Sequence, residues 1–169
     1  CLSSMIIIDN YFNNIDLVRA CGLDAEYYPP NENEHFGGYR SPRITEDTNI
    51  GKMLNDKIVK TLEDETDKSV SDIKIYFHCS PYFVMNNIDN FHEIKYHRDE
   101  SDYAGLVYIT PNPPQNTGTC IEGEECIENV YNRFIAYESN LKHGPDNLFG
   151  FELFTSRMTV TFFAELSST

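Results

Sequence analysis

The sequence predicts a mainly β fold preceded by helices, contained in a single domain that spans residues 1–169. An amphipathic helical pattern lies in the N-terminal part of the chain. From residue 72 onward, short strand-like runs alternate with turns, which is typical of a sandwich or a barrel. The composition agrees, because 11 Tyr and 11 Phe suit a pleated, half-buried surface. A chain of 169 residues is long enough for one sizeable core and too short for two comfortable domains.

The first 72 residues are expected to contain one short strand and two helices. The apolar run at 5–9 predicts a strand, and two asparagines after it can cap a helix over 15–21. The clearest amphipathic helix has apolar residues at helical spacing: Ile50, Met53, Leu54, Ile58 and Leu62. We expect the charged stretch 63–68 to end that helix as a solvated linker. Residues 1–4 are expected to be a cloning remnant.

Residues 28–43 are rich in Gly, Pro and aromatic side chains, which predicts a loop. Two interpretations stay open, a surface loop packed by its own aromatic rings or a lid near the mouth of a site. The later strands are predicted near residues 73–84, 91–98, 103–110, 117–121, 128–137, 148–153 and 157–165.

The charge of the chain limits the classes of partner. A formal net charge of −14 argues against broad attraction to nucleic-acid backbones or anionic membranes. The chain holds no apolar run of about 18 residues and no recognisable signal peptide, so the cytoplasm is the expected location. Five cysteines without a CxxC pair are expected to be reduced thiols, although Cys120 and Cys126 can pair if oxidised.

The sequence contains a candidate metal site. On a strand, His97 and Asp99 project to the same side while Arg98 turns away. This is the only HxD or HxE in the chain, but chance alone yields one about as often as not. His143 lies downstream in a predicted loop, where the alternative is a solvent-exposed histidine. Two histidines and one carboxylate can bind one face of a ferrous ion and leave the opposite face open.

Arg157 and Thr159 form a second candidate group. They share one face of the last predicted strand, so a guanidinium and a hydroxyl converge on one place. A planar fork of donors suits a small carboxylate. The alternative is a surface arginine that pairs with one of the many acidic residues.

The order of HxD, distal His and Arg-x-Thr resembles the Fe(II)/2-oxoglutarate-dependent dioxygenase family, particularly its prolyl-4-hydroxylase-like branch. Three surrounding segments resemble core strands of that branch, at 103–110, 132–137 and 157–163. The resemblance covers about residues 73–165.

This resemblance implies a double-stranded β-helix, a jelly-roll or cupin-like core over 73–165, with residues 5–72 as helical support. It implies that His97, Asp99 and His143 bind Fe(II) and are the catalytic residues. Arg157, Thr159 and Tyr108 would bind 2-oxoglutarate. Tyr82 is a further candidate for this contact, although a role as a core aromatic, shared with Tyr76 and His78, is favoured.

The implied reaction uses O2 to hydroxylate a C–H bond and releases succinate and CO2. The expected substrate is a protein side chain such as Pro or Lys, then a small amino acid or metabolite; nucleic acid is unlikely. The protein would be a monomer or a homodimer. Two alternatives stay open: a non-catalytic jelly-roll binding or structural module, and a cupin-type metalloenzyme that does not use 2-oxoglutarate.

Overall fold

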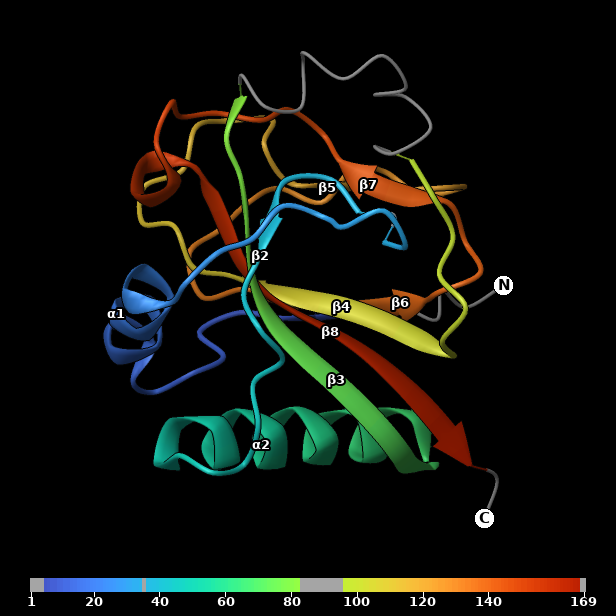
Figure 1. Ribbon diagram of the computed structural model, residues 1–169. Coiled ribbons are helices and arrows are strands. Elements are labelled where there is room, and N and C mark those ends of the chain that lie inside the picture. Colours follow the sequence, from blue (N-terminus) through green and yellow to red (C-terminus); the bar gives the residue numbers. More distant parts are fainter. Residues whose placement is uncertain (1–4, 35, 83–95, 168–169) are drawn as a thin grey trace.

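The computed structural model describes residues 5–34, 36–82 and 96–167 (Figure 1). No helix within these ranges combines the length and the apolar character needed to cross a membrane. The elements, in chain order, are β1 (Ile6–Ile8), α1 (Ile15–Asp24), β2 (Tyr39–Arg40), α2 (Asn49–Thr66), β3 (Ser69–Ser80), β4 (Tyr103–Tyr108), β5 (Thr119–Ile121), β6 (Phe134–Glu138), β7 (His143–Pro145), the 3-10 helix η1 (Leu153–Thr155) and β8 (Arg157–Ser167).

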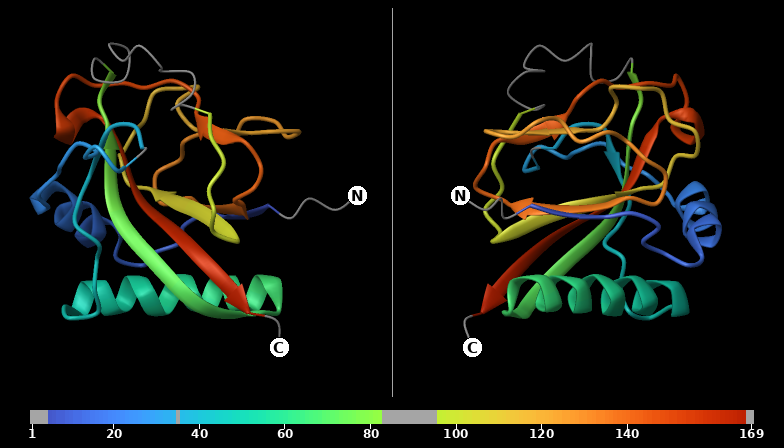
Figure 2. Two further views of the ribbon diagram at one scale, coloured as in Figure 1. Left: turned by 45° about the vertical axis from the view of Figure 1, so that its right-hand side comes forward. Right: turned by 180° about the vertical axis from the view of Figure 1, so that it is seen from behind.

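The strands form two sheets that face each other (Figure 2). The larger sheet has the order β1-β6-β4-β8-β3-β2 with antiparallel neighbours, and the smaller sheet pairs β5 with β7. Isolated bridges widen the smaller sheet on both sides, because His97 pairs with His143 and Ile127 pairs with Thr119. Apolar side chains of β4, β5 and β6 pack between the two sheets. This arrangement is the double-stranded β-helix that the sequence predicts.

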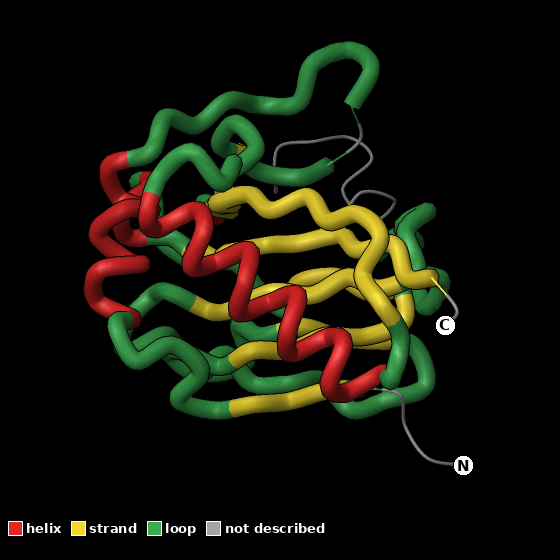
Figure 3. Tube along the Cα trace, turned by 90° about the horizontal axis from the view of Figure 1, so that it is seen from below, coloured by secondary structure: helices red, strands yellow, loops and turns green. Residues whose placement is uncertain are grey.

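The two faces of the larger sheet have different neighbours, as β8 illustrates. Met158, Val160, Phe162 and Ala164 are buried in the core cluster that contains the helix residues. Arg157, Thr159, Thr161 and Phe163 instead line a cavity on the opposite face. The alternation follows from the period of two in a strand, which sends successive side chains to opposite faces. Figure 3 shows α2 lying across the strands of the larger sheet.

Helix α2 covers the sheet with an apolar stripe and has defined ends. Leu54, Ile58 and Leu62 are fully buried. The Thr48 hydroxyl caps the first turn by accepting a hydrogen bond from the Gly51 amide at 3.1 Å. The helix continues to Thr66 and ends at Asp67, whose φ of 57° is left-handed. The expected linker at 63–68 is therefore wrong for residues 63–66, which form the last helical turn, while Asp67 and Lys68 connect the helix to β3.

Several other boundaries differ from the sequence predictions. Residues 148–153 form no strand; they lead into η1. Strand β6 begins only at Phe134, and β2 interrupts the expected loop at 28–43. Of the strand predicted at 91–98, residues 91–95 lie outside the described part of the chain, and His97 contributes a single bridge. Short segments such as β2 and the bridge at His97 are extended only because a neighbouring strand pairs with them, and local composition does not reveal such pairing.

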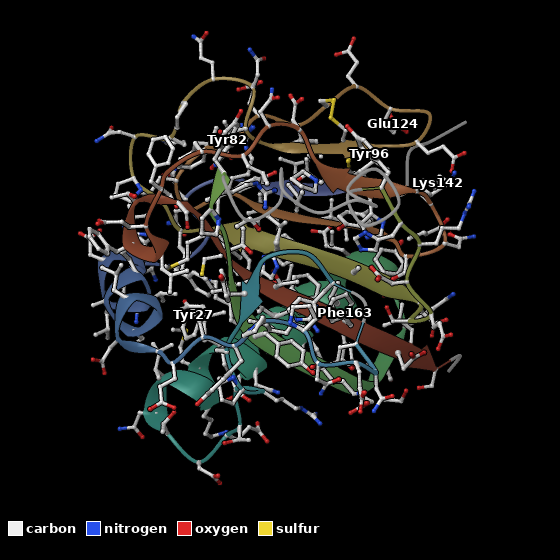
Figure 4. The ribbon with its side chains drawn as sticks, turned by 45° about the horizontal axis from the view of Figure 1, so that its top comes forward. Tyr27, Tyr82, Tyr96, Glu124, Lys142 and Phe163 are labelled. Carbon is white, nitrogen blue, oxygen red and sulfur yellow. A yellow bond between two sulfur atoms is a disulfide. The ribbon has the colours of Figure 1, made fainter. Side chains whose placement is uncertain are left out.

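Cys120 and Cys126 are joined by a disulfide, so the expectation of reduced thiols is wrong for this pair. Figure 4 shows the bond in the turn that carries Glu124. Gly123 in this turn has a φ of 81°, and Ile127 returns to pair with Thr119, which brings the two cysteines together. Because such bonds are rare in reducing compartments, the pair does not support the expected cytoplasmic location. Cys21 and Cys79 are free thiols.

Candidate active site

A cavity of about 90 Å³ lies between the two sheets. Its walls come from β2, β3, β4, β7, β8 and the segment that carries the HxD motif. Four alternate residues of β8 line it, because they share the face that points away from the helices: Arg157, Thr159, Thr161 and Phe163. The chain thus uses one face of the larger sheet for stability and the other to enclose a polar site.

The structure brings the predicted triad together at one edge of this cavity. One ligand atom from each of His97, Asp99 and His143 lies within 4.8 Å of the others. Asp99 Oδ2 is 2.8 Å from His143 Nε2, and Asp99 Oδ1 is 3.5 Å from His97 Nε2. His143 belongs to β7 rather than to the expected loop, and its backbone exchanges hydrogen bonds of 2.9 and 3.0 Å with His97. This pairing places the two imidazoles side by side.

The donor set fits a divalent metal ion. His143 Nδ1 is 2.7 Å from the Leu141 carbonyl oxygen, and a carbonyl can only accept, so Nδ1 carries a proton and donates it. Nε2 of the same ring is 2.8 Å from an Asp99 carboxylate oxygen, so an imidazole nitrogen and a carboxylate oxygen converge on one point, as two ligands of one metal ion do. Metal-binding histidines commonly donate their second nitrogen to a backbone carbonyl in this way.

Arg157 is a buried positive charge without a carboxylate partner among the described residues. Only 4% of its surface is exposed. It donates hydrogen bonds to the carbonyls of Thr117 and Gly118 and to the Thr119 hydroxyl, at 3.0 to 3.1 Å. Burial lowers the pKa of Arg157, but a guanidinium stays protonated in proteins. Three neutral acceptors orient the group without cancelling its charge, so the cavity attracts an anion.

Tyr108 and Thr159 lie near Arg157, and their expected contact with the co-substrate stays a prediction. The Tyr108 hydroxyl is 2.5 Å from Thr119 Oγ1, and its ring centre is 5.5 Å from Arg157 Cζ. Burial raises the pKa of Tyr108, so its hydroxyl remains a donor. Thr159 Oγ1 bonds Thr161 Oγ1 at 2.7 Å and faces the cavity. Thr119 completes the group, but sequence reasoning missed it because only pairing with β7 places it here.

Tyr82 is not among the residues that line the cavity, and its expected contact with the co-substrate stays a prediction. The side chain is 49% exposed and its ring packs edge-on against Phe151. Its backbone amide donates to the Gly150 carbonyl at 2.9 Å. Figure 4 shows Tyr82 well apart from Phe163, which lines the cavity. The strand β3 has ended at Ser80, so the alternation that aims His78 inward no longer applies to Tyr82.

Sequence reasoning missed Arg40 as a cavity residue, whereas His78, expected with Tyr76 among the interior aromatics, also lines the cavity. His78 and Thr159 are paired across β3 and β8, and Arg40 on β2 is paired with His78, so all three project to one face. Enclosure of the imidazole and then the charge of Arg40 lower the pKa of His78 to about 3, so this ring is neutral. A two-residue strand gives no periodic signal for Arg40.

The two facing sheets form the double-stranded β-helix fold that is found in 2-oxoglutarate–Fe(II) oxygenases. Similar solved structures include a Pseudomonas putida prolyl-4-hydroxylase, with 13% identity, a TM-score of 0.66, and coverage of 98% of this chain and 94% of that one. A Trichoplax adhaerens prolyl hydroxylase, solved with a peptide fragment of the hypoxia inducible factor oxygen degradation domain, has 11% identity and a TM-score of 0.66, covering 96% and 84%.

A third similar structure is an oxidoreductase of the 2OG-Fe(II) oxygenase family from Burkholderia pseudomallei. It has 10% identity and a TM-score of 0.60, and the match covers 96% of this chain and 85% of that one. No protein-family model and no curated protein sequence matches this chain. Identities this low establish the shared fold, and the function has to be argued from the site.

Proposed function

We propose that this protein is an Fe(II)- and 2-oxoglutarate-dependent oxygenase that hydroxylates a C–H bond and releases succinate and CO2. The observation that carries the proposal is the pairing of two features across one small cavity. A triad of two imidazoles and a carboxylate stands at one edge, and the uncompensated charge of Arg157 stands on β8. A ligand that chelates a metal at one end and carries a carboxylate at the other satisfies both.

His97, Asp99 and His143 would hold the iron, which supplies activation of O2 when bound. The hydrogen bond from His143 Nδ1 to the Leu141 carbonyl oxygen fixes the orientation of the ring, with Nε2 toward Asp99. Tyr137 packs its ring 4.5 Å from that of His143, so the imidazole has little freedom to rotate. These contacts prepare the triad before any ligand arrives.

Arg157 would bind the far carboxylate of 2-oxoglutarate. Its bonds to Thr117, Gly118 and Thr119 hold the guanidinium in one orientation, which lowers the entropy lost on binding. The Tyr108 and Thr159 hydroxyls would add neutral donors beside the same carboxylate. The surrounding walls of Leu106, Ala104 and Phe163 are apolar, which limits the access of water to the reacting centre.

The substrate is proposed to be a protein side chain or a small metabolite. Two of the similar structures are prolyl hydroxylases, and one was solved with a peptide fragment. The cavity of about 90 Å³ is far smaller than the roughly 300 to 1,000 Å³ of drug-sized sites. It therefore suits small ligands rather than a bulky substrate.

Anaerobic titration of the purified protein with Fe(II) and 2-oxoglutarate tests the proposal. We expect a visible charge-transfer band only when both are present and, after air is admitted, succinate in excess of controls without iron. Zinc in place of iron is the matched control, since it binds the same donors but has no redox chemistry. Absence of both the band and 2-oxoglutarate binding by calorimetry contradicts the proposal.

Two other outcomes would identify the alternatives. Iron binding without any effect of 2-oxoglutarate would favour a cupin-type metalloenzyme. Absence of both metal and 2-oxoglutarate binding would favour a binding or structural module.

A further inference from the structure

A second arginine, Arg40, faces the same cavity and has no role in the proposed function so far. It lies on β2, the edge strand of the larger sheet, and its partner on β3 is His78. Arg40 lines both the inner cavity and an adjoining outer groove of about 520 Å³. Asp99 and Phe163 also belong to both, so Arg40 stands where the groove meets the triad.

Aromatic rings surround the Arg40 guanidinium, but none of its contacts satisfies its donors. Its Cζ is 4.0 Å from the ring centre of Phe36, 4.6 Å from that of Tyr76 and 5.4 Å from that of Phe163. Nε is buried without a hydrogen-bond partner. Among the described residues, no carboxylate lies within ion-pair distance of this guanidinium. Stacking holds the cation in place, while the N–H groups still require an acceptor.

The backbone fixes the position of Arg40. Its amide and carbonyl exchange hydrogen bonds of 3.0 and 2.9 Å with Tyr28. Just before it, the Gly37 carbonyl accepts a hydrogen bond from His78 Nε2 at 2.5 Å. Gly38 has a φ of 77°, and a Cβ there would be 2.5 Å from the Cys79 carbonyl oxygen. Arg40 is therefore a preorganised donor on a rigid strand rather than a flexible surface side chain.

The outer groove carries the opposite charge. Asp72, Glu100 and Glu165 line it, against a single lysine, Lys74. Asp72 is engaged at 3.6 Å by Arg43, which is exposed on the outer side. A ligand that reaches from the cavity into the groove thus contacts the Arg40 guanidinium first. It then enters a groove whose acidic side chains favour positive charge.

We propose that the oxidised substrate is a free amino acid, whose carboxylate binds Arg40 and whose ammonium group faces the acidic groove. This inference rests on the proposed function and names its substrate class. The planar guanidinium of Arg40 makes no hydrogen bond to the described residues and lies where the groove meets the cavity, so its terminal N–H groups suit a carboxylate. An internal residue of a protein lacks the free carboxylate and would leave the charge of Arg40 unpaired.

Anaerobic calorimetry of the protein loaded with Fe(II) and 2-oxoglutarate tests the inference. Each of the proteinogenic L-amino acids is titrated, followed by the primary amide of every one that binds. We expect at least one amino acid to bind, and its amide to bind at least tenfold more weakly. Arg40→Gln should weaken binding of that amino acid at least tenfold, and Arg40→Lys should weaken it less. Lys52→Gln, an exposed residue of α2 that pairs with Asp56 and lines neither the cavity nor the groove, should change it less than twofold.

The inference is overturned if 2-oxoglutarate binds but no amino acid does, if acid and amide bind equally, or if Arg40→Gln has no effect. If Arg40→Gln fails to fold, the comparison of acid with amide on the unaltered protein decides alone. Failure to bind 2-oxoglutarate is a separate result, because it contradicts the proposed function itself. Succinate release stimulated by a blocked peptide but by no free amino acid would assign the site to a protein substrate.

Discussion

The two faces of the larger sheet are built from the same strands, but one buries apolar side chains and the other buries polar ones. On the helix side, Phe162 is fully buried and stacks on Phe134 with ring centres 5.5 Å apart. On the cavity side, the same strand holds Arg157 and Thr159, each with less than 5% of its surface exposed. One face gains stability from apolar burial. The other keeps costly buried polar groups, which is the usual sign that a surface is retained for binding or chemistry.

The largest expected effect comes from removing the carboxylate of the triad. Asp99→Ala deletes the acceptor that faces both imidazoles, so succinate release should fall more than a hundredfold. Far-ultraviolet circular dichroism should be unchanged, because Asp99 is part of the cavity face and not of the apolar core. Glu124→Ala, an exposed carboxylate in the disulfide turn, is the control and should retain full activity. Equal activity in Asp99→Ala and wild type would contradict the site assignment.

Adjacent residues of β8 allow a direct test of the two faces. Phe162→Ala removes a fully buried ring from the helix side and should lower the free energy of unfolding by about 3–5 kcal/mol. Phe163→Ala removes a half-buried ring from the cavity side and should cost about 1 kcal/mol. Urea denaturation measures both. Similar losses in the two variants would show that the cavity face contributes as much to the free energy of unfolding as the helix face does.

Arg157→Gln should affect ligand binding. Loss of a charge-assisted contact worth about 1.5–3 kcal/mol should weaken 2-oxoglutarate binding about 10- to 150-fold. Arg98 provides the matched control, since it lies next to the triad in sequence but turns outward to the Asn140 carbonyl and Glu122. Calorimetry should show Arg98→Gln within twofold of wild type. A similar loss in both variants would indicate a general effect of net charge.

The smallest expected effect belongs to an ion pair that serves neither face. Arg133 Nε and Nη2 hold the Asp9 carboxylate at 2.6 and 3.1 Å, and this hydrogen bonding keeps the pKa of Asp9 below its usual value. Its contribution is present above a pH of about 4 and is lost as the pH falls through the lowered pKa. Because Asp9 is half exposed, Asp9→Asn should cost less than about 1 kcal/mol at pH 7. Urea unfolding at pH 3 and pH 7 checks that the difference shrinks in acid.

Local sequence patterns were sufficient for the elements that are long enough to contain several repeats of the helix or strand period. The spacing of Leu54, Ile58 and Leu62 correctly predicts α2, and the alternation in β8 correctly separates Arg157 and Thr159 from the core. The shared face of His97 and Asp99 follows from the same period of two. These features depend on covalent geometry and burial, which the order of residues determines directly. The single domain expected for the chain stays a prediction.

Tertiary pairing decided the rest. Strand β2 has two residues and β7 has three, so neither carries enough repeats to show a period, and each exists only because β3 or β5 binds it. That pairing places Arg40 and Thr119 at the cavity and brings His143 to Asp99 across 44 residues of chain. The sequence by itself determined which side chains share a face. Only the closing of two sheets decided which faces meet, because contacts between distant strands depend on the whole fold.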